Sequence, residues 1–175
     1  YRRSVGDAGR LLWQHRLGDD KHAIIGRAVE EGSVHKVADD IKGVHTRRQM
    51  VIIDEATSVP EAIYEACANL YSYPEEFLLV CIGNPRNKLD AFGRFCEPDK
   101  GWLTVGVETG EWEAKPFLAC GGAKPAVVTF DAEKSPNITA GHEVSRHLPT
   151  LTTVEAAKRS SGGQTPHYWQ NFRGF

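Results

Sequence analysis

The chain has 175 residues, and its 21 lysines and arginines against 23 aspartates and glutamates give a formal net charge of −2. This length fits one domain that buries a core of its own. The near-neutral charge excludes a wholly basic nucleic-acid coat but leaves room for a local basic patch. No apolar run approaches the roughly 20 residues that a membrane-spanning helix needs. The four cysteines include no CxxC pair, which gives little support to a zinc site or a disulfide scaffold.

Residues 1–45 are polar and rich in glycine, and only short apolar pieces at residues 11–13 and 23–25 interrupt them. This weak pattern predicts short helices or strands. The sequence opens at Tyr1 without an initiator methionine and stops at Phe175, directly after an aromatic-rich stretch that needs a packing partner. We therefore interpret the chain as a fragment of a longer protein.

The clearest pattern is a strand–helix–strand unit. Residues 50–53 (MVII) form a continuous apolar run, which is typical of a strand buried on both faces of a parallel sheet. A capping box at residues 58–61 (SVPE) then predicts the start of a helix that extends to about Leu70. A second apolar run at residues 77–82 predicts another strand, which ends at Gly83.

This unit predicts where the polar residues meet. A crossover helix makes the two strands parallel if they share a sheet, so both strands end at the same edge. Asp54 and Glu55 follow the first strand, and Asn84 follows the second. Ligands of open α/β sheets bind outside the carboxyl ends of the strands, so this edge is the expected site.

Signals after Pro85 are weaker. Residues 91–95 predict a short helix, and alternating apolar residues at 103–107 predict a strand. Another strand is expected at residues 126–130. A second capping box at residues 152–155 (TTVE) predicts a helix that runs to about Ser160.

Four apolar residues followed by Asp54 and Glu55 have the pattern of a Walker B strand. In such a site the first carboxylate holds the water shell of Mg²⁺, and the second polarises the water that attacks the γ-phosphate of ATP. The alternative is a buried strand that simply meets solvent at two acids. Asn84 at the tip of the next strand could donate to a γ-phosphate oxygen or orient the attacking water, or it could belong to a plain Gly-Asn-Pro turn.

Several segments, in order, resemble the large subunit of tailed-phage terminases, the ATP-driven motors that pump double-stranded DNA into a capsid. These segments are Gly43-Val44-His45, residues 51–66 (VIIDEATSVPEAIYEA) and residues 82–85 (IGNP). The likeness continues at residues 90–95, 130–137 and 165–175, and it is patchy before about Lys36.

The resemblance implies an α/β fold of the ASCE-type P-loop NTPases, with a mostly parallel sheet flanked by helices. Residues 1–175 would be the later part of the ATPase domain. Within it, residues 1–45 are a lead-in, residues 46–110 hold the Walker B and coupling motifs, and residues 111–175 lead toward a nuclease domain.

The resemblance also implies roles for single residues. Asp54 would bind Mg²⁺ and ATP, Glu55 would be the catalytic glutamate, and Asn84 would act in the coupling motif. Gly83 and Arg86 would contact the nucleotide. The candidates for an arginine that opposes the developing phosphate charge are Arg47, Arg48, Arg86 and Arg94.

The implied partners are double-stranded DNA, the terminase small subunit, the capsid portal protein and further copies in a homo-oligomeric ring. The implied place of action is the cytoplasm of the bacterial host, without a membrane partner.

Two departures from the family pattern are clear. The sequence contains no GxxxxGK[ST] loop, and the nuclease domain of the family is missing. We therefore expect this chain alone to hydrolyse ATP poorly or not at all. A helicase-like P-loop translocase and a non-enzymatic binding domain remain as alternatives. A nuclease strand at residues 127–131 that ends in the metal ligand Asp131 is a weaker hypothesis, because no well-placed partner carboxylates follow.

Overall fold

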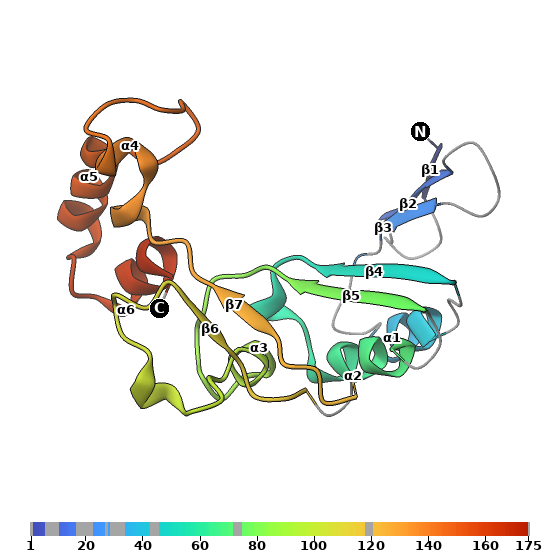
Figure 1. Ribbon diagram of the computed structural model, residues 1–175. Helices are drawn as coiled ribbons and strands as arrows, with labels where there is room; N and C mark the ends of the chain where they lie inside the picture. Colours follow the sequence, from blue (N-terminus) through green and yellow to red (C-terminus); the bar gives the residue numbers. More distant parts are fainter. Residues whose placement is uncertain are drawn as a thin grey trace.

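We describe a computed structural model of the chain, in which residues 2–5, 11–16, 23–26, 28, 34–42, 46–71, 75–117 and 121–174 are described. These residues form small sheets with helices beside them, so the expected mixed α/β class is confirmed (Figure 1). The terminase-like segment Gly43-Val44-His45 lies outside the described residues.

Strands β2 (Leu11–Arg16) and β3 (Ala23–Gly26) contain the two short apolar pieces of the lead-in, and strand β1 (Arg2–Val5) precedes them. The three strands form an antiparallel sheet in the order β1-β2-β3. Helix α1 (Val34–Lys42) follows them. The prediction of short elements in this region is therefore confirmed.

The strand–helix–strand unit is confirmed as well. Strand β4 (Arg48–Ile53), helix α2 (Glu61–Leu70) and strand β5 (Glu76–Cys81) follow each other, and β4 pairs with β5 in parallel, with Ile53 opposite Cys81. The predicted capping box is wrong. Ser58 ends a short 3-10 helix, η2 (Ala56–Ser58), and helix α2 starts after Pro60 without a side-chain cap.

Helices α1 and α2 pack against each other on one side of the β4–β5 pair (Figure 1). The core between these layers contains Ile53, Ile63, Ala66 and Cys67. On the opposite face the apolar side chains are uncovered: Met50 is 60% exposed, Ile52 58% and Leu78 50%. Within the described residues, the prediction that these strands are buried on both faces is therefore wrong, because helices cover only one face.

A third small sheet follows β5. Helix α3 (Ala91–Phe95), as predicted, precedes a 3-10 helix, η3 (Trp102–Thr104). Strands β6 (Glu111–Glu113) and β7 (Ala126–Val128) then pair antiparallel, and β7 confirms the strand predicted around residues 126–130.

Two sequence expectations fail in this region. Residues 103–107 do not form a strand, because the chain turns back at η3, where the amide of Thr104 donates to the carbonyl of Gly101. A mostly parallel sheet is also not found among the described strands, where β4 and β5 are the only parallel pair. The described part of the connection between β6 and β7 contains no crossover helix, and the two strands pair antiparallel.

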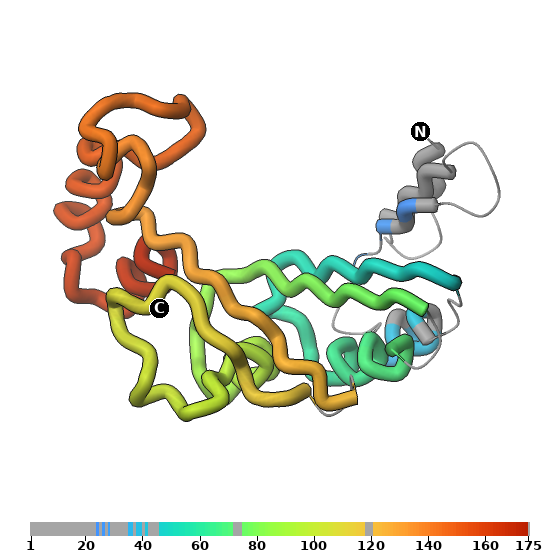
Figure 2. Tube along the Cα trace, viewed as in Figure 1, coloured from blue at the N-terminus to red at the C-terminus, as the bar shows by residue number. Residues whose placement is uncertain are grey.

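The elements of the remaining described chain are helices: η5 (Ala132–Lys134), α4 (Pro136–Thr139), α5 (Leu151–Ser161), α6 (Pro166–Tyr168) and a π-helical turn, η6 (Trp169–Arg173). An irregular segment at residues 140–150 separates α4 from α5. The predicted helix near Ser160 is confirmed as α5, but its cap is Thr150, whose side chain accepts from the amide of Thr153. Figure 2 follows the chain through α5 and back toward the end of β7.

Candidate functional site

The turn after β4 carries the two acidic residues of the predicted site. Asp54 and Glu55 are exposed, and the Asp54 Oδ1 atom accepts a hydrogen bond of 3.0 Å from the Glu55 amide. The backbone of Glu55 is left-handed, with φ 52° and ψ 40°, and it is the single non-glycine residue with positive φ in the described part of the chain. This conformation costs about 1–2 kcal/mol, so the surrounding structure must hold it in place.

Ala56 shows what holds this turn. It is completely buried, and its amide donates to the carbonyl of Ile82 at 2.9 Å. Its own carbonyl accepts a hydrogen bond of 2.8 Å from the buried hydroxyl of Tyr64. Burial raises the pKa of Tyr64, so the phenol stays protonated and remains a donor. The acidic turn is thus bonded to the end of β5 and to helix α2.

A second set of contacts joins the acidic turn to the loop after β5. The Thr57 hydroxyl donates to the backbone carbonyl of Asn84. A Cβ atom added at Gly83 would lie 3.0 Å from Thr57 Oγ1 and 3.1 Å from the Ala56 nitrogen. Any larger residue would have to displace the acidic turn slightly, which is a packing reason for the Gly83 of the sequence motif.

The structure brings the predicted site residues together. Asp54, Glu55, Gly83, Asn84 and Arg86 all line one pocket at the carboxyl ends of β4 and β5. Its volume is about 490 Å³, which is within the usual range for small-molecule sites. The expectation that the two strand ends share one edge is confirmed by the parallel register of β4 and β5.

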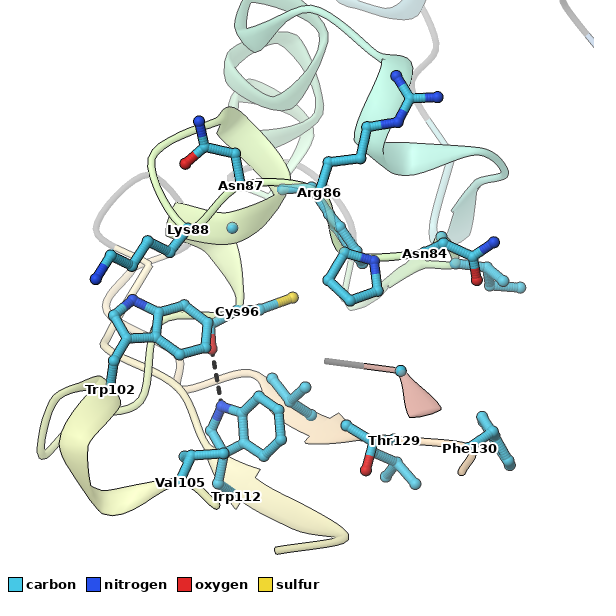
Figure 3. A pocket seen from close by; sticks show the side chains of 18 of the residues that line it. Asn84, Arg86, Asn87, Lys88, Cys96, Trp102, Val105, Trp112, Thr129 and Phe130 are labelled. Carbon is cyan, nitrogen blue, oxygen red and sulfur yellow. Dashed lines mark hydrogen bonds between the residues drawn. The ribbon is translucent and has the colours of Figure 1, made fainter. Parts of the chain in front are cut away.

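The pocket has a polar wall and an apolar wall (Figure 3). The polar wall is the loop after β5, with Asn84, Asn87 and Lys88. The apolar wall comes from η3 and the β6–β7 sheet, and its residues include Trp102, Val105, Trp112, Val127 and Phe130. The Trp112 indole donates to the Cys96 carbonyl at 2.8 Å, and the Trp102 and Trp112 rings meet edge to face at 6.4 Å.

Cys96 also lines this pocket. Burial, followed by the charge of Asp90, raises the pKa of its thiol to about 12. The thiol is therefore protonated at neutral pH, where a nucleophile or a metal ligand would have to be a thiolate. Cys96 thus belongs to the apolar packing of the pocket.

The four candidate arginines are separated by the structure. Arg47 and Arg48 lie at the amino end of β4, where they pair with Glu75 at 2.6 Å and with Glu76 at 3.2 Å. Arg94 pairs with Glu61 on helix α2. Arg86 lines the pocket. Within this chain, Arg86 is therefore the candidate that shares a pocket with the two acids, whereas Arg47 and Arg48 lie at the opposite end of the strands.

The donor set at this edge suits one kind of metal site. Among the described residues, no group of three or more His, Cys, Asp and Glu side chains could hold a metal ion. Mg²⁺ with a nucleotide needs only one or two protein carboxylates, because waters and phosphate oxygens complete its shell. Asp54 and Glu55 fit that requirement, with Arg86 and Lys88 as the cations that line the same pocket. The described pocket has no glycine-rich phosphate loop.

Asp131, the weaker nuclease candidate, has another role. Its side chain is only 4% exposed and forms an ion pair with Arg173 at 2.9 Å. Its Oδ1 atom also accepts a hydrogen bond from the Glu133 amide. These contacts, both on Oδ1, make Asp131 an anchor for the end of the described chain, and its Oδ2 atom is buried without a hydrogen-bond partner.

The sequence analysis missed residues that contact the loop after β5 from other parts of the chain. A Cβ atom at Gly93 would overlap the carbonyl of Asn87 and main-chain atoms of Lys88, so helix α3 supports the loop after β5 through a glycine. Gln170 and Asn171 contact the same loop from the far end of the sequence. The glycine inside a predicted helix was a visible signal, whereas nothing in the sequence indicated the long-range contacts.

Comparison with protein-family models, with curated proteins and with solved structures gave no match. In the described part of the chain, no helix combines the length and the apolar character needed to cross a membrane. The site is therefore interpreted from its own geometry and from the resemblance of its motifs.

Proposed function

We propose that this chain carries the hydrolytic edge of a P-loop-type ATPase site and belongs to a DNA-packaging motor similar to the terminase large subunit. The observation that carries this proposal is the left-handed Glu55, which is held beside Asp54 in the same pocket as Asn84. Strained backbone of this kind is concentrated at functional sites, and a plain strand terminus has no need of it.

Each of these residues has a chemical role in the proposed site. Mg²⁺, when bound with ATP, would neutralise phosphate charge. Asp54 would hold its water shell, and the exposure of this residue directly after β4 supports that role. Glu55 would accept the proton of the attacking water, and Asn84 would donate an N–H to a phosphate oxygen.

Arg86 and Gly83 complete the proposed nucleotide contacts. Arg86 lines the pocket and would oppose the negative charge of the phosphates. Gly83 acts through the backbone, because its lack of a side chain lets Asn84 approach the acidic turn. The P-loop NTPase fold itself is part of this proposal, and the parallel β4–α2–β5 unit supports it.

The wider setting also belongs to the proposal. By resemblance, the motor would act on double-stranded DNA in the host cytoplasm during capsid filling. Its partners would be the terminase small subunit, the portal protein and further copies of itself in a ring.

The test compares Glu55→Gln with Glu65→Gln, a matched change on the exposed side of helix α2. In the full-length protein we expect Glu55→Gln to keep Mg²⁺–ATP binding and to lower turnover by about 10²–10⁴-fold, the usual contribution of a positioned base. Glu65→Gln should leave both unchanged. A near-normal turnover in Glu55→Gln would refute the assignment.

A non-enzymatic binding domain is the second candidate, and one observation favours it. The uncovered apolar face of β4 and β5, with Met50, Ile52 and Leu78, is the kind of surface that binds another protein segment. This alternative predicts that the full-length protein has no affinity for Mg²⁺–ATP, measured with a fluorescent ATP analogue.

A further inference from the structure

The end of the described chain touches the loop of the proposed site. The Asn84 side-chain amide donates to Asn171 Oδ1 at 3.3 Å, and the Gln170 side-chain amide donates to the Arg86 carbonyl at 3.1 Å. Both partners lie on the π-helical turn η6, far away in the sequence. Two residues of the proposed nucleotide site are therefore bonded to the same short segment.

The direction of the Asn171 amide is set within its own helix. Its Nδ2 group donates to the carbonyl of His167 at 2.9 Å. The nitrogen is thus used inside the helical segment, and the oxygen is left to accept from Asn84. Asn171 is an oriented acceptor rather than a side chain that meets Asn84 by chance.

The η6 segment is itself firmly anchored on its other side. Arg173 forms ion pairs with Asp131 at 2.9 Å and with Glu133 at 3.1 Å, and its guanidinium lies 5.0 Å from the centre of the Trp169 ring. The buried Tyr168 donates to Glu133 at 2.7 Å. Asn84 and Arg86 are therefore bonded to a segment that is itself anchored by ion pairs and a hydrogen bond.

Asn84 is held at both of its polar ends. Thr57 fixes its backbone carbonyl, so the side chain is the part whose direction is still to be set. The amide nitrogen carries two N–H groups, and a bond to Asn171 uses one of them. The other N–H remains for the phosphate contact that the proposed function assigns to Asn84.

We infer that Asn171 and Gln170 are positioning residues, which fix the amide of Asn84 and the backbone of Arg86 at the proposed nucleotide site. The role of Asn84 toward a phosphate rests on the proposed function, whereas the contact between the two segments does not.

The first measurement uses the chain without nucleotide. NMR signals of the Asn84 side-chain amide are compared in the wild type, Asn171→Asp and Asn171→Leu. The aspartate keeps an acceptor oxygen, whereas leucine has a similar size and no acceptor. Both variants lose the Nδ2 bond to His167, so the acceptor is what distinguishes them. We expect the hydrogen-bonded Asn84 N–H signal to move upfield in Asn171→Leu and to keep a downfield, hydrogen-bonded position in Asn171→Asp, where the carboxylate still accepts. A matched control, Gln164→Ala in the exposed turn before α6, should leave them unchanged.

The second measurement uses turnover of the full-length protein. Loss of one hydrogen bond is worth about 0.5–1.5 kcal/mol, so Asn171→Leu should lower kcat by roughly 2- to 13-fold with little change in KM. Asn171→Asp should restore most of the loss, which a purely structural role would not require. Gln170→Ala should act in the same direction as Asn171→Leu.

The outcomes separate the two proposals. Unchanged Asn84 signals in Asn171→Leu would overturn the positioning role, whatever the protein does with ATP. Shifted signals in a protein that fails to bind Mg²⁺–ATP would support the positioning role and refute the proposed function. Equal loss of kcat in Asn171→Leu and Asn171→Asp would also overturn the inference.

Discussion

The two ends of the β4–β5 pair use charge in opposite ways. At the amino ends, Arg47 and Arg48 pair with Glu75 and Glu76, and all of these side chains are largely exposed. At the carboxyl ends, Asp54 and Glu55 have no ion pair among the described residues, and they face a pocket.

This difference shows that the backbone strain and the tight packing are found at the carboxyl ends of the strands. Exposed ion pairs are worth little and need no special backbone. The carboxyl end contains a strained Glu55, a glycine at a close approach and a long-range contact to η6. The following predictions test whether these constraints serve the pocket.

Gly93→Ala should have the largest effect on stability. The new methyl group would overlap the carbonyl of Asn87 and main-chain atoms that cannot move freely, which costs about 2–3 kcal/mol. Urea unfolding should show this loss. Gly106→Ala is the control, since a Cβ atom there meets nothing within 4 Å. Equal stability of the two variants would show that α3 does not support the loop at this point.

Glu133→Gln should destabilise the anchor of η6 in a pH-dependent way. Burial opposes the charge of Glu133, but hydrogen bonds from Lys158 and Tyr168 and the charge of Arg173 outweigh burial and lower its pKa. The stabilisation is therefore complete above the ordinary carboxyl pKa of the unfolded chain, and it is lost as the pH falls through the lowered folded value.

At pH 7 we expect Glu133→Gln to be less stable than the wild type by about 1–2 kcal/mol. The free energies of unfolding of the two proteins should converge in acid. Urea unfolding at pH 7 and at acidic pH measures both. Glu143→Gln, an exposed glutamate between α4 and α5, should not show this convergence. A difference that is independent of pH would rule out the charge of Glu133 as its source.

Glu55→Gly should make the protein more stable while it removes the proposed base. Glycine adopts the left-handed conformation without steric cost, so a gain of about 0.5–1 kcal/mol is expected in thermal or urea unfolding. Glu65→Gly, within helix α2, should instead lose about 1 kcal/mol. A destabilised Glu55→Gly would show that the turn is not strained, and the comparison between the two strand ends would lose its main support.

Arg48→Ala should have the smallest effect. Its pair with Glu76 is exposed, with side-chain exposures of 72% and 66%. A double-mutant cycle with Glu76→Ala should give a coupling below about 1 kcal/mol. A larger coupling would mean that the ion pairs at the amino ends also stabilise the fold appreciably, and the contrast between the two ends would be weaker.

The strand–helix–strand unit could be predicted from the sequence because its signals are local. A continuous apolar run, a helical spacing and a second apolar run each depend on near neighbours. The predicted caps were wrong at both helices, because Ser58 ends the η2 turn and the cap of α5 is Thr150, two residues before the predicted capping box at residues 152–155. Burial on both faces failed too, since it depends on which elements cover a sheet.

The candidate site was predictable in part for the same reason. Parallel pairing brings Asp54 and Asn84 to one edge, and that consequence follows from topology alone. The apolar wall with Trp102 and Trp112 was not predictable, because η3 and β6 carry weak local patterns. The sequence alone could not place these tryptophans in the same pocket as Asn84.

The sequence by itself determined the local chemistry: two acids after an apolar strand, and an asparagine after the next one. Only the tertiary structure decided the left-handed backbone of Glu55, which of the four candidate arginines lines the pocket, and the contact of Asn84 with Asn171. The physical reason is the distance along the sequence between the residues that determine each feature. Strands and helices follow from the spacing of neighbours, whereas strain and long-range hydrogen bonds exist only after distant segments have packed against each other.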